Sequence, residues 1–176
     1  MSSESITTAL FLITAVVASA VLINAMYPVI QNMAGTFSSS THESDVRIRT
    51  DFKIIATHAI GSIDGSDGTV QVWMKNIGSE RIGLADIKRS DVFCGEVGNF
   101  DHLTYNYVEP ANLENLELGN WTEEFGTGYD LNNNKFWDPG ETVKITAKAP
   151  FSSRDQVFFQ FALPNGIWRS IEFTAS

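Results

Sequence analysis

The chain has 176 residues, enough for one compact domain with an appendage but rarely enough for two independent cores. Its 12 Lys and Arg residues stand against 21 Asp and Glu residues, so the formal net charge is -9 and the phosphate backbone of a nucleic acid would be repelled. A single cysteine, Cys94, excludes an internal disulfide framework and a thiolate metal cluster, and we expect it to be a small buried side chain.

The first predicted element is an apolar helix, assigned to residues 1–32. No Asp, Glu, Lys or Arg lies between Glu4 and Glu43, and 17 of the 22 residues from Ile6 to Tyr27 are apolar. At about 1.5 Å per residue, that segment forms a helix of about 33 Å, which can span a hydrocarbon core of about 30 Å. A secretory signal would carry Lys or Arg before a shorter apolar run, and a soluble core helix would be apolar along one stripe only. The sequence therefore predicts a helix in a membrane or in a helical bundle.

Small residues on this helix favour close packing against other helices. Ala15 and Ser19 form a small-xxx-small pair, which lets two helix backbones approach in lipid or in a dry bundle. A lone membrane anchor is the open alternative, because small residues are common in membrane helices. Pro28 is expected to kink or end the span. Residues 33–50, which turn to Gly, Ser and then charged residues, are predicted to be a helical stalk or a linker.

The remaining segment, residues 51–176, is predicted to be an extracytoplasmic β domain. Short alternating runs are separated by Gly, Asn, Asp and Pro, and a hairpin is expected at Pro164-Asn165-Gly166. Seven or eight such runs without a convincing helix indicate an immunoglobulin-like β-sandwich, so the predicted fold class is mainly β after a single long N-terminal hydrophobic α-helix. The predicted strands are residues 52–58, 70–75, 81–84, 90–94, 103–108, 143–148, 155–163 and 167–174.

Motifs for catalysis are missing from the sequence. It contains no GxSxG, HExxH, CxxC or Walker loop. The three histidines, His42, His58 and His102, share no metal-ligand spacing. We therefore predict no catalytic residue, no small-molecule substrate and no enzymatic activity.

One segment, residues 130–141, has the spacing of a calcium-binding loop. Oxygen-bearing side chains fall at positions 1, 3, 5, 9 and 12, and position 7 can offer its backbone carbonyl. Lys135 stands where such loops have glycine, and no flanking helices are expected, so only the loop and not the helix-loop-helix unit is predicted. A polar Asn-rich turn is the alternative. The predicted calcium ligands are Asp130, Asn132, Asn134, Phe136, Asp138 and Glu141.

A candidate glycosylation site supports an exterior location. Asn120-Trp121-Thr122 is the only N-x-[ST] sequon, and it would accept a glycan if the domain lies outside the membrane. The orientation cannot be derived from charge, since neither flank of the span is basic nearby.

Four segments resemble a known group of archaeal proteins. Residues 7–25, TTALFLITAVVASAVLINA, are similar to the hydrophobic N-terminal helix of archaeal flagellins (archaellins) and of the FlaG and FlaF accessory proteins of the archaeal flagellum (archaellum). RIRTDFKII and VWMKNIGSERI resemble the helix-to-strand junction and first hairpin of the FlaG and FlaF group, and WDPGETVKI resembles late strands of the superfamily. The resemblance implies an apolar helix joined to an immunoglobulin-like domain outside the cell membrane, and a role in motility.

Within this group the resemblance favours a FlaG-like stator or accessory subunit. Archaellins begin with a short basic leader cut after Lys-Gly or Arg-Gly, whereas here residues 1–4, MSSE, lead directly into the helix. The expected partners are other copies of the chain, further archaellum subunits such as a FlaF-like protein, the surface layer and the membrane. An archaellin-type filament subunit and a membrane-anchored adhesin or binding module are the alternatives.

Overall fold

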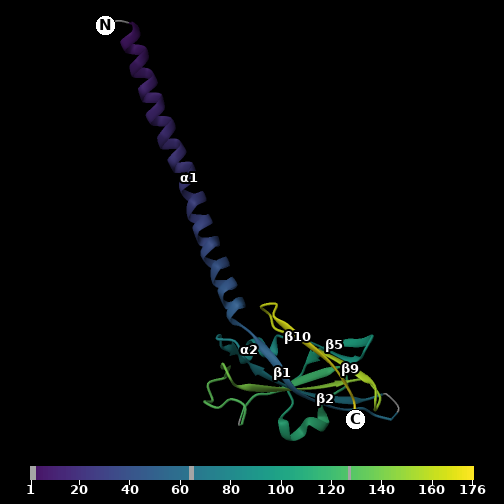
Figure 1. The fold of residues 1–176 in the computed structure, drawn as a ribbon. Helices are drawn as coiled ribbons and strands as arrows, with labels where there is room; N and C mark the ends of the chain where they lie inside the picture. The colour runs from purple at the N-terminus through teal and green to yellow at the C-terminus, as the bar shows by residue number, and fades with distance from the viewer. Residues whose placement is uncertain (1–2, 64–65, 127) are drawn as a thin grey trace. The chain divides into compact units, whose positions relative to one another are not determined.

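The computed structural model describes residues 3–63, 66–126 and 128–176. Contacts divide the chain into two units, Met1–Asp45 and Val46–Ser176. The described residues of the first unit, 3–45, belong to one long helix, and the second unit contains the strands (Figure 1). The predicted fold class, a long apolar helix before a mainly β domain, is confirmed.

Helix α1 runs from Ser3 to Arg49 without interruption. Pro28 was expected to kink or end the span; the helix does not end there but continues, and the predicted stalk or linker is helical up to Arg49. Proline is tolerated inside membrane helices because neighbouring side chains and small backbone adjustments satisfy the carbonyl that loses its donor. Residues 1 and 2 of the predicted first segment lie outside the described residues.

Several threonine and serine hydroxyls of α1 donate to backbone carbonyls of the helix itself. Thr14 Oγ1 donates to the carbonyls of Leu10 and Phe11, and Thr8 Oγ1 donates to that of Glu4 at 2.9 Å. Such bonds leave no free hydroxyl donor at these positions, which suits an apolar surrounding where an unmet polar group is costly. By length and composition α1 is able to cross a membrane, and no residue of it is buried against the rest of the chain.

The second unit is built on one large sheet. Within the described residues it has eight strands in the order β1-β2-β8-β6-β5-β4-β9-β10, and a two-stranded sheet pairs β3 with β7. Neighbouring strands are antiparallel except β5 and β6, and the edge strands β1 and β10 contact each other, so the sheet curls into a sandwich. The strands are β1 (Phe52–Ile60), β2 (Gly68–Asn76), β3 (Ile82–Gly83), β4 (Asp91–Glu96), β5 (Asn99–Tyr105), β6 (Asn120–Glu124), β7 (Phe136–Trp137), β8 (Thr142–Ala149), β9 (Gln156–Ala162) and β10 (Trp168–Thr174).

Alternation along the strands places the core. On β2, Val70, Val72 and Met74 are fully buried while the residues between them are half-buried or exposed, as expected for a strand with one face on the core. Their register partners on β8 are also apolar and fully buried. Aromatic rings fill the centre, where Phe161 meets Phe52 edge-on at 5.6 Å between ring centroids.

Short elements differ from the sequence prediction. The expected strand at residues 81–84 shrinks to Ile82–Gly83, and Leu84–Lys88 forms a short helix, α2. A 3-10 helix, η1, spans Pro110–Asn115. Helices of five or six residues are too short to show a 3.6-residue period, so they could not be read from the pattern. Strand β6 was not predicted either, because two acidic residues at its end break its apolar alternation.

Candidate functional site

The predicted calcium loop lies between β6 and β8 and contains the short strand β7. Asp130 and Glu141, its first and last residues, are both buried. Asp130 Oδ1 accepts a hydrogen bond from the backbone N–H of Asn134 at 3.2 Å, and Oδ2 accepts one from that of Lys135 at 2.9 Å. These two bonds fold the first half of the loop around the Asp130 carboxylate.

Glu141 closes the loop from its other end. Its Oε1 accepts a hydrogen bond from the N–H of Leu131 at 2.9 Å, and its Oε2 accepts one from the N–H of Asp138 at 3.0 Å. Both carboxylate oxygens are thus held inside the loop. This is the position at which a calcium loop carries its bidentate ligand.

The middle ligands converge on Asp138. Its Oδ2 accepts hydrogen bonds from Nδ2 of Asn132 at 2.8 Å and from Nδ2 of Asn134 at 2.7 Å. These two bonds, the one from Asn132 first, lower the pKa of Asp138 below its ordinary value, and Arg81 at 3.9 Å adds a smaller effect of the same sign. Five of the six predicted ligand residues therefore contribute side chains to one hydrogen-bonded cluster.

Backbone geometry at Lys135 matches the turn that a calcium loop makes at its sixth position. Lys135 has a φ of 64° and Asn133 one of 54°, both in the left-handed region. Glycine adopts this conformation freely, whereas another residue is destabilised by about 1–2 kcal/mol. The loop thus makes the sharp turn without the glycine whose absence the sequence analysis noted.

The loop would have to rearrange two side chains to hold a cation. Among the described residues, no three His, Cys, Asp or Glu side chains are grouped so that they could hold a metal ion. Asn132 and Asn134 turn their amide nitrogens toward Asp138. Because calcium takes oxygen ligands, both amides would need to rotate so that Oδ1 faces inward. Phe136, the sixth predicted ligand, lies on β7, where its ring packs under the Arg81 guanidinium at 5.3 Å.

The two predicted packing residues lie one helical turn apart on α1. The Ser19 hydroxyl donates to the backbone carbonyl of Ala15 at 2.8 Å, and both residues are exposed. The hydroxyl therefore lies along the helix backbone. Because both side chains are small, another helix backbone could approach α1 closely at this pair.

The candidate glycosylation residue, Asn120, begins β6 and is half-buried. The hydroxyl of Thr122, which completes the sequon, is buried with its residue and accepts a hydrogen bond from the N–H of Val108 at 3.1 Å. Attachment of a glycan to the folded domain would require this bond to open, so modification before folding is the accessible route.

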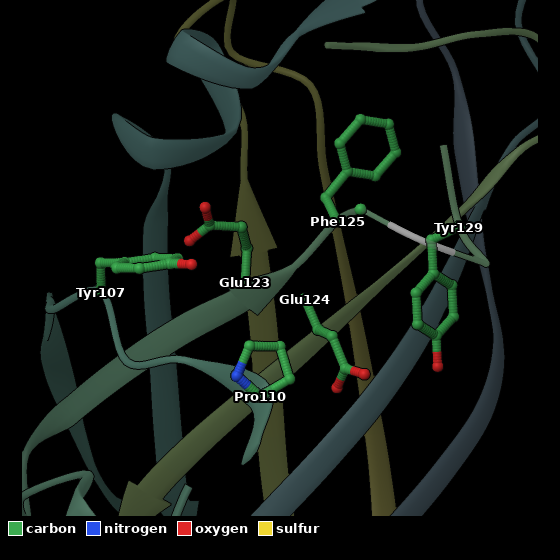
Figure 2. Close-up of a pocket in the computed structure, with 7 residues that line it drawn as sticks. Tyr107, Pro110, Glu123, Glu124, Phe125 and Tyr129 are labelled. Atoms are coloured by element: carbon green, nitrogen blue, oxygen red, sulfur yellow. The ribbon is translucent and has the colours of Figure 1, made fainter. Parts of the chain in front are cut away.

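A pocket at the end of β6 escaped the sequence analysis. It has a volume of about 350 Å³, and its lining includes Tyr107, Glu123, Glu124, Phe125 and Tyr129 (Figure 2). No role was predicted for Glu123 from the sequence, and it is only 4% exposed. Only the pairing of β6 with the apolar β8 buries Glu123, and strand pairing is not visible in the sequence.

Comparisons with known proteins agree with this architecture. The sequence profile of archaeal-type flagellin matches residues 2–173. An uncharacterised protein of Archaeoglobus fulgidus is 27% identical over 170 residues, which cover 95% of each chain. Among solved structures, the archaellum periplasmic stator protein FlaG of Sulfolobus acidocaldarius matches with a TM-score of 0.51 and 24% identity, over 70% of this chain and 99% of that one. The archaeal flagellum of Methanospirillum hungatei matches with a TM-score of 0.64 and 18% identity, over 97% of this chain and 93% of that one.

Proposed function

The chain belongs to the archaeal-type flagellin family, and on this premise we propose that it is a structural, non-enzymatic component of the archaellum that supports motility. The observation that carries the proposal is the extent of the family match, which includes both the apolar helix and nearly the whole β unit. A match to the β unit alone would fit any exported sandwich domain. Together with the helix, it describes the two-part subunit from which archaella are built.

Within the archaellum we propose a membrane-anchored, FlaG-like accessory or stator subunit. The β unit of this chain is similar to almost the full length of a protein described as a periplasmic stator. Helix α1 presents apolar side chains on all sides over more than a membrane thickness, and no described residue of it is buried. A subunit anchored by such a helix resists torque if its β domain binds a fixed partner outside the membrane.

This role places the β unit outside the cytoplasm. Partners would then meet the sandwich through its exposed strands. The edge strands β1 and β10 contact each other without a ladder of hydrogen bonds between them, so each keeps backbone groups that can pair with another chain. Other copies of the chain, a FlaF-like subunit and the surface layer are the partners that we propose.

We further propose that the loop at residues 130–141 binds one calcium ion, which would stiffen it. Support comes from the spacing of Asp130, Asp138 and Glu141 in the loop, from the hydrogen bonds that hold the Asp130 and Glu141 carboxylates to the loop backbone, and from the left-handed turn at Lys135. With three carboxylates among five side chains, the affinity should lie in the range of extracellular modules, about 10⁻⁴ to 10⁻³ M.

A filament subunit is the second candidate. It is supported by the likeness of the chain to an archaeal flagellum over 97% of its length, helix included. In a filament, α1 would be covered by the helices of other copies instead of lipid, and its small residues suit both surroundings.

Fractionation of native cells separates the two candidates. Filaments are sheared from the cells, membranes are collected from the sheared cells, and the chain is quantified in both fractions by mass spectrometry. The stator proposal expects the chain in the membrane and motor fraction and only traces in the filaments. Enrichment in sheared filaments would replace it with the filament candidate. Retention in the membrane without co-purification with the archaellum motor would favour the adhesin alternative.

A further inference from the structure

The last turn of α1, Val46–Arg49, belongs to the second unit and is fastened to it through the backbone. Four consecutive N–H groups, those of residues 77–80 between β2 and β3, donate to two carbonyls of the chain that leaves the helix. The carbonyl of Asp51 accepts the first two bonds at 3.0 Å and 2.9 Å, and that of Arg49 accepts the other two at 2.9 Å and 3.2 Å. A helix commonly leaves its last carbonyls to water or to a local cap. Here the β unit itself supplies the donors.

The chain is buried on both sides of Asp51. Thr50 is only 4% exposed, and its Oγ1 donates to the carbonyl of Val46 at 2.7 Å. Phe52, the first residue of β1, is fully buried against Trp137 and Phe161. A flexible linker is exposed and rich in glycine and serine. The connection between the helix and the sheet is therefore short and held, unlike such a linker.

Gly78 allows the close approach of these segments. A Cβ at this position would lie 2.4 Å from the carbonyl oxygen of Arg49 and 2.5 Å from the backbone nitrogen of Asp51. Both are backbone atoms, which cannot turn aside as the end of a flexible side chain can. A residue larger than glycine must therefore push the helix end and the loop apart.

Asn76 fixes the same loop from within the core. It is fully buried, and its Nδ2 donates to the carbonyls of Glu80 at 2.9 Å and of Trp137 at 2.8 Å. Its Oδ1 accepts from the N–H of Gly78 at 2.9 Å, and its own N–H donates to the carbonyl of Glu141 at 3.0 Å. Because a buried amide group without partners is costly, this set of bonds allows the loop one position only.

Two ion pairs surround the contact but are not expected to hold it. Arg49 lies 3.8 Å from Glu80, and Arg169 of β10 pairs with Asp51. All four side chains are partly exposed to water, where ion pairs contribute little and are screened by salt. The backbone hydrogen bonds should therefore keep the contact closed in high salt.

We propose that residues 46–51 and 76–80, which we call the joint, form a rigid connection through which force on α1 reaches the sheet, with Asn76 and Gly78 as its positioning residues. Helix α1 runs from Ser3 into the joint without interruption, so a force on the helix enters β2 and the core instead of being absorbed by a linker. The inference deepens the proposed function and rests on it, because only a subunit under load needs such a connection.

Hydrogen exchange of the unmodified full-length chain in detergent micelles tests the joint first. The amides of Ser79 and Glu80 should exchange as slowly as those of β9, a strand that is paired on both sides. This protection should persist in high salt. Exchange at the rate of an open loop, or protection that salt removes, would overturn the proposal.

Two variants then open the joint from different sides. Gly78→Ala inserts the clashing Cβ, and Asn76→Asp keeps the shape but replaces both Nδ2 donors by an acceptor. Each should speed exchange at residues 79 and 80 about tenfold, as expected when one or two backbone hydrogen bonds weaken, and leave the amides of β9 unchanged. Gly126→Ala is the matched control, since a Cβ there meets nothing within 4 Å. Equal acceleration at β9 would assign these residues a general structural role and contradict the proposal.

Distances between spin labels test the rigidity itself. Ile48, in the last helical turn, is 83% exposed, and Asp101 on β5 is exposed, so Ile48→Cys with Asp101→Cys provides two sites for labels. Burial raises the pKa of the Cys94 thiol to about 12, so this native cysteine stays protonated and unlabelled at neutral pH. Electron spin resonance should give one narrow distance distribution, which Gly78→Ala broadens and Gly126→Ala does not. A broad distribution without Gly78→Ala would show a swivel and overturn the proposal.

The failure of this inference can be told from that of the proposed function. In cells, Gly78→Ala should leave the amount of chain in the archaellum motor fraction unchanged and lower the swimming speed. Normal swimming with a loosened joint would contradict the inference alone. A rigid joint in a chain that does not fractionate with the archaellum would leave the joint standing and contradict the proposed function.

Discussion

The indole Nε1 of Trp137 donates a hydrogen bond of 2.8 Å to the backbone carbonyl of Glu141, the residue that closes the candidate calcium loop. Trp137 is fully buried and packs against Phe52 at 5.8 Å between ring centroids. Its own carbonyl accepts a hydrogen bond of 2.8 Å from Nδ2 of Asn76, at the end of β2. The end of the polar loop is thereby tied to the core of the sandwich.

Replacing this tryptophan should separate its packing from its hydrogen bond. Trp137→Ala should lower the free energy of unfolding by about 3–5 kcal/mol, because a large buried ring is removed. Trp137→Phe keeps an aromatic ring but removes one of the two hydrogen bonds to the Glu141 carbonyl, which still accepts from the backbone N–H of Asn76 at 3.0 Å, so a smaller loss is expected. Chemical denaturation of both variants measures the two losses, and equal losses would mean that the hydrogen bond dominates.

Calcium should stabilise the protein if the loop binds it. Binding to the folded state alone adds about 2.7 kcal/mol when calcium is at 100 times its dissociation constant, so the melting temperature should rise. Glu141→Gln should abolish most of that rise by weakening the closing ligand. If calorimetry shows no heat of binding and millimolar calcium leaves the melting temperature unchanged, the loop does not bind calcium and is a polar turn.

Asp155→Asn is the control for the calcium experiment. Asp155 accepts a hydrogen bond from the N–H of Ser152 in a different turn, at 2.7 Å. Its replacement can shift the baseline melting temperature but should leave the calcium-dependent rise intact. A lost rise in both variants would show that calcium acts elsewhere.

Acid should weaken the loop through Asp138. The pKa of Asp138 is lower in the folded protein than its ordinary value, so the charged group contributes stability above about pH 4 that is lost as pH falls through the folded pKa. In calcium-free buffer, Asp138→Asn should therefore reduce the fall in stability between pH 5 and pH 2, taken as roughly the carboxylate range. Asp101→Asn, an exposed change on β5, is its control. If Asp138→Asn leaves the dependence of stability on pH unchanged, the acid-induced loss of stability does not come from Asp138.

If α1 packs against other helices through Ala15 and Ser19, bulky residues at these positions should impair assembly. Ala15→Leu and Ser19→Leu should push packed helices apart and reduce crosslinked oligomers or incorporation into the archaellum. Val16→Leu, a change of similar chemistry on a neighbouring position, is the control. Unchanged assembly in both variants would make α1 a simple anchor and assign association to the β unit.

Elements with a long, regular pattern could be predicted from the sequence, and those set by tertiary pairing could not. The apolar run at residues 6–27 and the alternation at residues 70–75 and 143–148 became α1, β2 and β8. Pro28 was expected to kink or end the span, but α1 continues through it. Proline breaks isolated helices, whereas it is tolerated in helices that cross membranes.

The candidate sites show the same division. The spacing of Asp130, Asn132, Asn134, Asp138 and Glu141 predicted a calcium-binding loop. In the structure these residues form a hydrogen-bonded loop, and calcium binding by them stays a prediction. The burial of Glu123 could not be predicted from the sequence, because it depends on the pairing of β6 with β8 and on Lys88, which is 35 positions away in sequence.

Motility of cells that lack the gene for this chain tests the central proposal most directly. Swimming is tracked in the deletion strain and in the strain with the gene restored, and filaments are counted by electron microscopy. A membrane-anchored stator subunit predicts that cells lose swimming while they still carry filaments, and that the restored gene returns swimming to normal. Swimming at the wild-type speed in the deletion strain would contradict a structural role in the archaellum.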